Sequence, residues 1–314
     1  MLNEISHTLA GRNLNKPDLP IRTAIDLFQV FNASENKADA TLYWYERVLG
    51  ELFPPKGLVD PDRPIGEITE IELRQHISSI RQRERNGRRI SPGAVETSVR
   101  ALRSFFHWAF DEGYTHEHLL GRFRFKAPKT LIEPLTDDEL DRLLRAVEQN
   151  PYFAFVAKIL VDTGLRSSEF CNLKLDDVDL KRGVIFVREG KGAKDRMVPL
   201  GRTSVRVMLE WLKVHRPDSE YENVVVDLKG RPITRHHVQV IMRRLKSWAR
   251  IPRLKAHLLR HTFATRYLEN GGDALMLKAV LGHSSLVMTD RYVHLVSARA
   301  AATARGFSPL DGLG

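Results

Sequence analysis

The chain has 314 residues and a single cysteine, Cys171, so no disulfide can form within it. A lack of disulfides is typical of proteins from a reducing compartment. Cys171 lies in the apolar pattern Phe170-Cys171-Asn172-Leu173, which predicts a small buried residue rather than a nucleophile. No apolar run is long enough to span a bilayer, and the polar N-terminus lacks the apolar stretch of a secretory signal. These absences predict a soluble cytoplasmic protein without a membrane partner.

Two common kinds of enzyme site are also missing from the sequence. There is no Gly-x4-Gly-Lys-Ser/Thr loop, which argues against nucleotide hydrolysis. Twelve histidines are present, and either His236-His237 or the pair His257 and His261 could in principle bind a metal. However, Leu258 stands where a His-Glu-x-x-His zinc motif has its glutamate. We therefore predict neither a metal nor another cofactor.

Positive charge is in excess. The chain has 49 lysines and arginines against 39 acidic residues, a formal net charge of +10, and its pI is near 9.8. Such a balance favours a polyanionic partner such as nucleic acid, although a basic enzyme with another substrate would have it too. The length suits two domains with sizeable cores.

The first part of the chain predicts a small helical domain over residues 21–121, after a loose tail at residues 1–20. Apolar residues recur at helical spacing from Ile21, and a second helix over residues 38–52 would stop at Pro54-Pro55. Thr69 and Glu72 have the spacing of a capping box, and Ser91-Pro92 has the pattern of an N-cap followed by proline. Four helices of this length indicate a bundle, with the aromatic residues of the fourth helix in its core.

The second part predicts a larger domain over residues 135–314, joined to the first by a basic linker at residues 122–134. A second capping box at Thr136 would begin its first helix. Residues 183–188 and 196–200 have the pattern of two strands joined by a turn, and helices resume after Leu200. The fold class we expect is mainly α with a small β-sheet (α+β).

Four short motifs occur in order along this second domain. They are Thr163-Gly164-Leu165-Arg166, His257-Leu258-Leu259-Arg260-His261, Leu281-Gly282-His283-Ser284-Ser285 and, nine residues after His283, Tyr292. Taken singly, each has an ordinary explanation, such as a surface arginine paired with the glutamate three residues later. Together and in this order they resemble the tyrosine recombinases, the family of phage integrases and Xer chromosome-dimer resolvases. The resemblance covers roughly residues 21 to 300 and implies an N-terminal core-binding domain and a C-terminal catalytic domain.

In that family two arginines clamp the scissile phosphate, and the resemblance assigns this role to Arg166 and Arg260. A guanidinium suits the role because it donates two parallel hydrogen bonds and keeps its charge. Tyr292 is then the nucleophile, and its phenol, with an ordinary pKa of about 10, needs cationic neighbours to attack as a phenolate. Tyr267 lies too close to Arg260 in the sequence to fit the pattern.

The resemblance also assigns three proton donors or carriers. Lys191, in the turn Gly190-Lys191-Gly192, would be the general acid for the leaving 5′ oxygen. His257 would assist proton transfer at the tyrosine, and His283 would donate to a nonbridging oxygen. Lys194 and Arg196 stand close to Lys191 in the sequence, and we assign them to the DNA backbone instead.

Other basic residues are predicted to contact DNA phosphates. They gather at the end of the third helix, in the linker, in the predicted hairpin and on the helix that begins near Thr234: Arg81, Arg83, Arg85, Arg88, Arg89, Arg122, Arg124, Lys126, Lys194, Arg196, Arg235, Arg243 and Arg244. A solvated charged surface is the alternative explanation for such runs.

The implied activity is site-specific recombination of double-stranded DNA at a short dyad-like site, through a 3′-phosphotyrosine and a Holliday junction. The implied assembly is a homotetramer on two DNA sites, in the cytoplasm at the nucleoid, with a helix over residues 297–305 docked on a neighbouring subunit. A partner recombinase or a directionality factor could be required. The chain starts near the core-binding domain, which favours an Xer-like or small mobile-element recombinase. Two alternatives remain: a type IB topoisomerase, and a DNA-binding regulator without catalysis.

Overall fold

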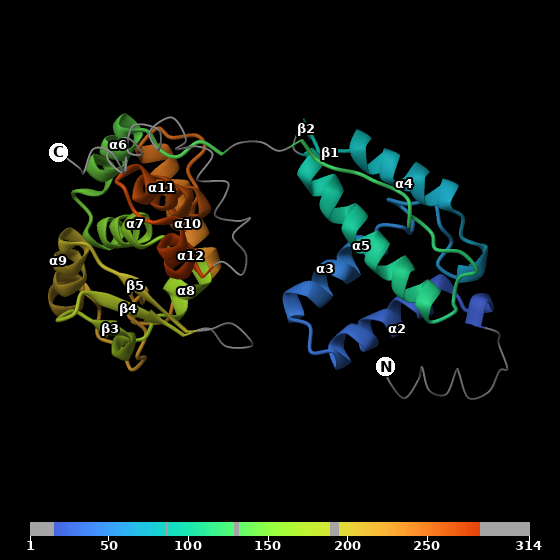
Figure 1. Cartoon of the computed structure of the whole chain (residues 1–314), viewed down its shortest axis with the longest axis horizontal. Coiled ribbons are helices and arrows are strands. Elements are labelled where there is room, and N and C mark those ends of the chain that lie inside the picture. Colours follow the sequence, from blue (N-terminus) through green and yellow to red (C-terminus); the bar gives the residue numbers. More distant parts are fainter. Residues whose placement is uncertain (1–15, 86, 129–131, 189–194, 283–314) are drawn as a thin grey trace, which may run out of the picture. The chain divides into compact units, whose positions relative to one another are not determined.

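The computed structural model describes residues 16–85, 87–128, 132–188 and 195–282. The chain divides into an N-terminal unit, residues 1–130, and a C-terminal unit, residues 131–314, and each has its own core (Figure 1). Both units are mainly helical, and a small sheet lies in the C-terminal unit, as the sequence predicted. No helix in these described ranges is both long enough and apolar enough to cross a membrane.

Four α-helices make up most of the N-terminal unit. They are α2 (Ile21–Ser34), α3 (Asp39–Gly50), α4 (Glu70–Gln82) and α5 (Pro92–Asp111), accompanied by the 3-10 turns η1 (Lys16–Asp18) and η2 (Ile65–Glu67) and by a two-stranded ribbon of β1 (Glu84–Arg85) and β2 (Arg88–Arg89). The two predicted helix starts are confirmed. The hydroxyl of Thr69 accepts a hydrogen bond from the Glu72 N–H while Glu72 accepts one from Thr69, and Ser91 accepts from the N–H of Ala94. These caps satisfy N–H groups that the first turn of a helix leaves unpaired.

Aromatic side chains form the centre of this unit. The ring of Phe28 on α2 contacts Tyr45 on α3 and Phe105 on α5, with ring centroids 4.9 and 5.5 Å apart and edge-to-face geometry. Phe105 and Phe106 are fully buried. They are therefore core residues, as expected from the sequence, and not a platform for stacked bases.

The segments on either side of the bundle are better packed than the sequence suggested. Residues 16–20 were expected in a loose tail, but Leu19 is buried and its carbonyl accepts a hydrogen bond from the Ile65 N–H (2.8 Å). At the other end, Phe123 and Phe125 of the expected linker pack against the core, beneath the guanidinium groups of Arg74 and Arg81. Both differences have the same cause, since apolar side chains within these segments gain from burial.

One buried histidine makes the stability of the N-terminal unit depend on pH. Burial, aided by the guanidinium of Arg83 and opposed by Glu51, lowers the pKa of His76 to about 4. Among the described residues, none offers a hydrogen bond to its Nε2. The neutral imidazole therefore contributes fully to stability above the unfolded pKa of about 6.5, and this contribution is lost as the pH falls from 6.5 towards 4.

We expect a His76→Leu variant to lose less stability than the wild type between pH 7.5 and 4.5, by up to about 3 kcal/mol. Urea unfolding at the two pH values measures this difference. A His116→Ala variant, which removes an exposed histidine of the same unit, is the control and should follow the wild type. Equal pH dependence in His76→Leu and the wild type would contradict the assignment.

The C-terminal unit consists mainly of helices, with one three-stranded sheet. Its elements are α6 (Asp137–Val147), α7 (Pro151–Thr163), α8 (Ser167–Asn172), the 3-10 turn η3 (Leu175–Asp177), β3 (Val178–Asp179), β4 (Val184–Val187), β5 (Arg196–Pro199), α9 (Arg202–Glu210), the π-helical turn η4 (Trp211–His215), α10 (Arg235–Trp248), α11 (Ala256–Glu269) and α12 (Ala274–Leu281). The strands pair antiparallel in the order β3-β4-β5, with Ile185 opposite Val198. The two predicted strands are confirmed, whereas β3, with two residues, is too short to show a pattern in the sequence.

Helix α7 lies at the centre of this unit, where it packs against α6, α9 and α11 (Figure 1). The indole of Trp211 stacks on Phe155, with ring centroids 4.6 Å apart, and donates to the Val224 carbonyl (2.9 Å). Cys171 is buried, as predicted, and burial raises the pKa of its thiol to about 11. A thiol with that pKa is not a nucleophile near neutral pH.

Candidate functional site

The site begins with two helix ends. Helix α7 ends at Thr163 and helix α12 ends at Leu281, and each is followed by a glycine in the left-handed conformation, with φ of 61° at Gly164 and 65° at Gly282. Glycine is favoured at such a position because it has no Cβ to clash. The last carbonyls of a helix lack intrahelical partners and carry partial negative charge. Two of the four sequence motifs thus place carbonyl groups where a cation can be held.

Arg260 lies between these two helix ends. Its Nη1 donates to the Gly164 carbonyl and its Nη2 donates to the Leu281 carbonyl, each at 2.7 Å. The residue is 3% exposed, so its charge is held almost out of water. The negative ends of two helices and two charge-assisted hydrogen bonds compensate for that loss of hydration.

Arg166 lies beside the same two helix ends, directly before α8. Its Nη2 donates to the Gly282 carbonyl (3.0 Å), its Nη1 to Glu169 Oε1 (2.5 Å), and its backbone N–H to Glu169 Oε2 (2.7 Å). Its side chain is 38% exposed, so part of the guanidinium faces solvent. The sequence left open whether Arg166 was a surface arginine paired with Glu169 or part of a site. The ion pair is present, and it is one of the contacts that hold Arg166 beside Arg260.

Glu169 and Arg196 form a buried ion pair next to Arg166. Arg196 Nη2 donates to Glu169 Oε2 (2.7 Å) and its Nε donates to the Val280 carbonyl (2.8 Å). Burial opposes ionisation of Glu169, but hydrogen bonds from Arg196 and from the Arg166 N–H outweigh it and lower the pKa of Glu169. The side chain of Arg196 is 7% exposed. This guanidinium is buried and already bonds a carboxylate and a carbonyl, so its surroundings favour a role in supporting Arg166 over the predicted contact with the DNA backbone.

The two histidines of the motif on α11 point to different surroundings. His257 is exposed on the same helix as Arg260, and the protein atoms around its ring, then the charges of Arg260 and Lys255, lower its pKa. His261 is buried, and its Nε2 donates to the Ile132 carbonyl. His257 is thus available to a substrate, whereas His261 is not.

Four of the predicted site residues lie outside the residues that the structure describes. They are Lys191, Lys194, His283 and Tyr292, and the proposed docking helix over residues 297–305 lies there too.

The close packing at Gly164 gives a prediction for stability. A Cβ at this position would come within 2.5 Å of Phe263 Cδ1 and 3.1 Å of Leu281 Cδ2, whereas a Cβ at Gly113, with a similar φ of 77°, would meet nothing. Alanine at either position adds about 1–2 kcal/mol of backbone strain, and at Gly164 overpacking adds about 1–3 kcal/mol more. We expect urea unfolding to show a larger loss for Gly164→Ala than for Gly113→Ala. Equal losses would contradict the packing argument.

The structure separates the predicted DNA contacts of the N-terminal unit by their surroundings. Arg83 Nη1 donates to Glu51 (2.9 Å) and its Nη2 to the Lys56 carbonyl (2.6 Å), so Arg83 has a structural role in the unit. Arg124 donates to the Gly121 carbonyl (2.7 Å). Arg88 and Arg89 are exposed on β2. A guanidinium that is open to solvent can approach a phosphate at lower cost than one that must first leave an ion pair.

Two exposed arginines of α5 are further candidates for contact with DNA. Arg100 and Arg103 are exposed on this helix and line a cavity of about 450 Å³ together with His107, His118 and Phe125. The signal was present in the sequence, because residues three apart on a helix share a face. In the C-terminal unit Arg235, Arg243 and Arg244 are exposed on α10, opposite its buried face.

Comparisons with known proteins agree with this geometry. The phage integrase family model matches residues 133–299. The tyrosine recombinase XerD of Listeria innocua is 29% identical over 297 residues, covering 91% of this chain and 98% of that protein. The tyrosine recombinase XerA of Thermococcus onnurineus is 36% identical over 228 residues, covering 71% and 77%. Among solved structures, the Tn1549 transposon integrase in complex with transposon right end DNA has a TM-score of 0.75 at 20% identity, covering 92% and 100%.

A mainly helical unit with a small antiparallel sheet, in which two arginines meet at glycine-capped helix ends, has the fold of the solved integrase structures. The protein belongs to the phage integrase family, among its tyrosine recombinases of Xer type. It is accordingly a site-specific DNA recombinase, which cleaves and rejoins DNA strands.

Proposed function

We propose that the protein cleaves one strand at a time by attack of the Tyr292 phenolate on a backbone phosphorus. A bond forms between the phenol oxygen and phosphorus, and the bond to the 5′ oxygen breaks, leaving a 3′-phosphotyrosine. Lys191 gives a proton to the leaving 5′ oxygen. Attack by the 5′ hydroxyl of the partner strand reverses these steps, and the first pair of exchanges produces a Holliday junction. Because the energy of the broken ester is kept in the phosphotyrosine, no nucleotide hydrolysis is required.

The observation that carries this proposal is the fixed pair of Arg166 and Arg260. The transition state places extra negative charge on the nonbridging phosphate oxygens, and fixed donors are worth more there than donors that must reorganise. Contacts to the carbonyls of Gly164, Leu281 and Gly282 fix both guanidinium groups, and Arg166 keeps an exposed side towards a substrate. His283 is the further donor that the family pattern supplies.

His257 suits a role as proton acceptor for the tyrosine. Its lowered pKa keeps the imidazole neutral at neutral pH, and a neutral imidazole has a free lone pair for the phenol proton. Burial is the main cause of the lowered pKa of His257, and the charges of Arg260 and Lys255 add to it. Cations of this kind would favour the phenolate of Tyr292.

DNA is held, in our proposal, by exposed cations of both units. In the N-terminal unit these are Arg88 and Arg89 on the ribbon and Arg100 and Arg103 on α5, together with the linker cations Arg122, Arg124 and Lys126. Arg81 and Arg85 of the N-terminal unit and Lys194 of the C-terminal unit remain predicted contacts to DNA phosphates. In the C-terminal unit they are Arg235, Arg243 and Arg244 on α10. Contacts of this kind weaken as salt is added, because binding releases counterions.

The assembly we propose is a homotetramer on two copies of a short dyad-like site. A solved λ integrase tetramer bound to a Holliday junction has a TM-score of 0.70 to this chain at 18% identity, covering 88% of this chain and 77% of that one, which supports a fold compatible with such an assembly. A second recombinase or a directionality factor would act on this tetramer. The work of the complex is dimer resolution, integration or transposition in the cytoplasm at the nucleoid.

Covalent trapping on DNA tests this proposal. The protein is incubated with fragmented genomic DNA, adducts are captured under denaturing conditions, and both the DNA and the modified peptide are sequenced. We expect a DNA adduct on Tyr292 at a short dyad-like sequence. Adducts at scattered sequences would favour a topoisomerase. Tight binding without an adduct, with or without added host extract, would favour a non-catalytic regulator.

A further inference from the structure

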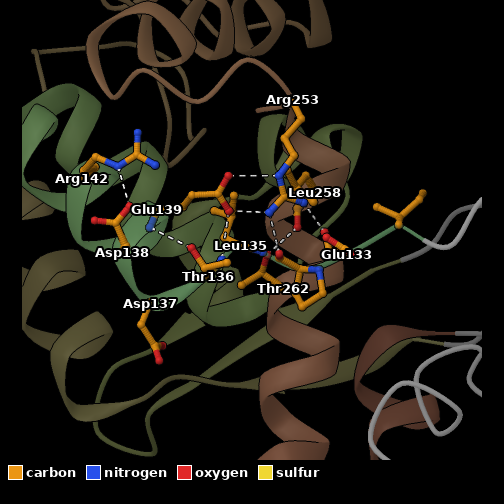
Figure 2. A network of polar contacts seen from close by, with 12 residues as sticks. Glu133, Leu135, Thr136, Asp137, Asp138, Glu139, Arg142, Arg253, Leu258 and Thr262 are labelled. Atoms are coloured by element: carbon orange, nitrogen blue, oxygen red, sulfur yellow. Dashed lines mark hydrogen bonds and ion pairs between the residues drawn. The ribbon is translucent and has the colours of Figure 1, made fainter.

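The segment that leads into the C-terminal unit forms hydrogen bonds with the helix that carries Arg260. This leading segment, residues 132–135, bonds through its main chain to side chains from residues 253–266 (Figure 2). The contacts are His261 Nε2 to the Ile132 carbonyl, Arg253 Nη1 to the Glu133 carbonyl (2.5 Å), Arg253 Nη2 to the Pro134 carbonyl (2.7 Å), the Leu135 N–H to Thr262 Oγ1 (2.9 Å), and Arg266 Nη2 to the Leu135 carbonyl (3.3 Å).

The side chains that make these contacts are buried or form further hydrogen bonds. Thr262 is 1% exposed and His261 is 7% exposed. Arg253 also bonds both carboxylate oxygens of Glu139, and Glu139 in turn accepts from the Thr136 N–H (3.0 Å) at the start of α6. The leading segment, the N-terminus of α6 and helix α11 therefore form one connected polar network, drawn in Figure 2.

The order of residues along the chain makes this network important for the site. His257 and Arg260 lie between the anchors at Arg253 and at Thr262. Arg260 and His261 are neighbours, yet Arg260 bonds the ends of α7 and α12 while His261 bonds the leading segment. Helix α11 is thus held from two directions, and we expect the loss of either set of contacts to loosen it. Displacement of a reacting group by about 1 Å can cost about 100-fold in rate.

We propose that Arg253, His261 and Thr262 are positioning residues for Arg260 and His257, because their contacts to the leading segment hold the start and middle of helix α11 in place. The inference deepens the proposed function and rests on it for the roles of Arg260 and His257.

Two variants remove these anchors, and each has a matched control. Arg253→Ala is paired with Arg142→Ala, because the hydrogen bonds of Arg142 among the described residues go to Asp138 and to the carbonyls of Ala249 and Arg250, outside the leading segment. Thr262→Val, which removes the hydroxyl at similar volume, is paired with Thr262→Ser, which keeps it. The first readout is amide hydrogen exchange of α11 in the full chain without DNA. The second is the single-turnover rate of adduct formation at saturating DNA, with the dissociation constant measured alongside.

We expect amides of residues 258–262 to exchange at least about tenfold faster in Arg253→Ala and Thr262→Val than in the wild type. Adduct formation should slow by about 10- to 100-fold while the dissociation constant stays the same. Both controls should behave as the wild type.

Equal effects in Arg142→Ala would refute the proposal, because they would show general loosening of the network. Faster exchange with a wild-type rate of adduct formation would also refute it, because α11 would then move without consequence for Arg260. A wild type that forms no adduct would contradict the proposed function instead, and the exchange pattern would still decide whether these residues anchor α11.

Discussion

A Tyr292→Phe variant is expected to bind DNA as the wild type does and to form no covalent adduct, a loss of at least about 10⁴-fold in cleavage rate. Phenylalanine keeps the ring and removes the one oxygen that would bond to phosphorus. The ester must be formed in line with the leaving 5′ oxygen, so the attacking oxygen has to be at this position. Denaturing gel electrophoresis of a labelled site shows the adduct directly.

Tyr267→Phe is the matched control for this prediction. Tyr267 lies on α11, seven residues after Arg260, and its ring packs near Phe263, with centroids 6.0 Å apart. Its hydroxyl should be dispensable for cleavage. An adduct that persists in Tyr292→Phe and disappears in Tyr267→Phe would reverse the assignment of the nucleophile.

The second large effect is expected at Arg260. Its replacement by lysine should slow adduct formation by about 10²- to 10³-fold, because a single ammonium cannot bond both helix ends and still present a fixed edge to phosphate. Replacement by alanine should additionally destabilise the protein, since the carbonyls of Gly164 and Leu281 would remain buried without a donor, at about 1–3 kcal/mol each. Single-turnover kinetics and urea unfolding separate the two effects.

Arg142→Lys provides the comparison. Arg142 also bridges two main-chain carbonyls, those of Ala249 and Arg250, but it does so on the network around α6. We expect this variant to cleave DNA at the wild-type rate. If Arg260→Lys cleaves equally fast, the bidentate clamp is not needed and the role given to Arg260 is wrong.

Sequence reasoning succeeded where structure depends on neighbours along the chain. The caps at Thr69, Ser91 and Thr136 each need one side chain and an N–H three residues later, so their spacing was sufficient. A signal of the same local kind exists at Gly164 and Gly282, because glycine tolerates the positive φ that ends each helix, although no helix end was predicted from it. The α+β class followed from the change of hydrophobic period at the strands.

The sequence says less where a residue has its hydrogen-bond partner far along the chain. Arg196 and Arg83 were assigned to DNA because they stand in basic runs, but their carboxylate partners lie 27 and 32 residues away. The leading segment is a further case, because its anchors begin more than a hundred residues later. A run of charged residues in the sequence shows composition only. The folded structure shows which of these charges already take part in ion pairs within the protein.

The contacts of Arg260 with the carbonyls of Gly164 and Leu281 determine which amino-acid substitutions the site can accept during evolution. Its acceptors are main-chain carbonyls, and every amino acid carries one, so substitutions at Leu281 leave that acceptor in place. We expect substitutions at Gly164 and Gly282 to disturb the site more, because the backbone conformation of these glycines sets the direction of the carbonyls at the two helix ends. The chain can therefore diverge widely in the helices around the site while two small residues keep the geometry of the arginines constant.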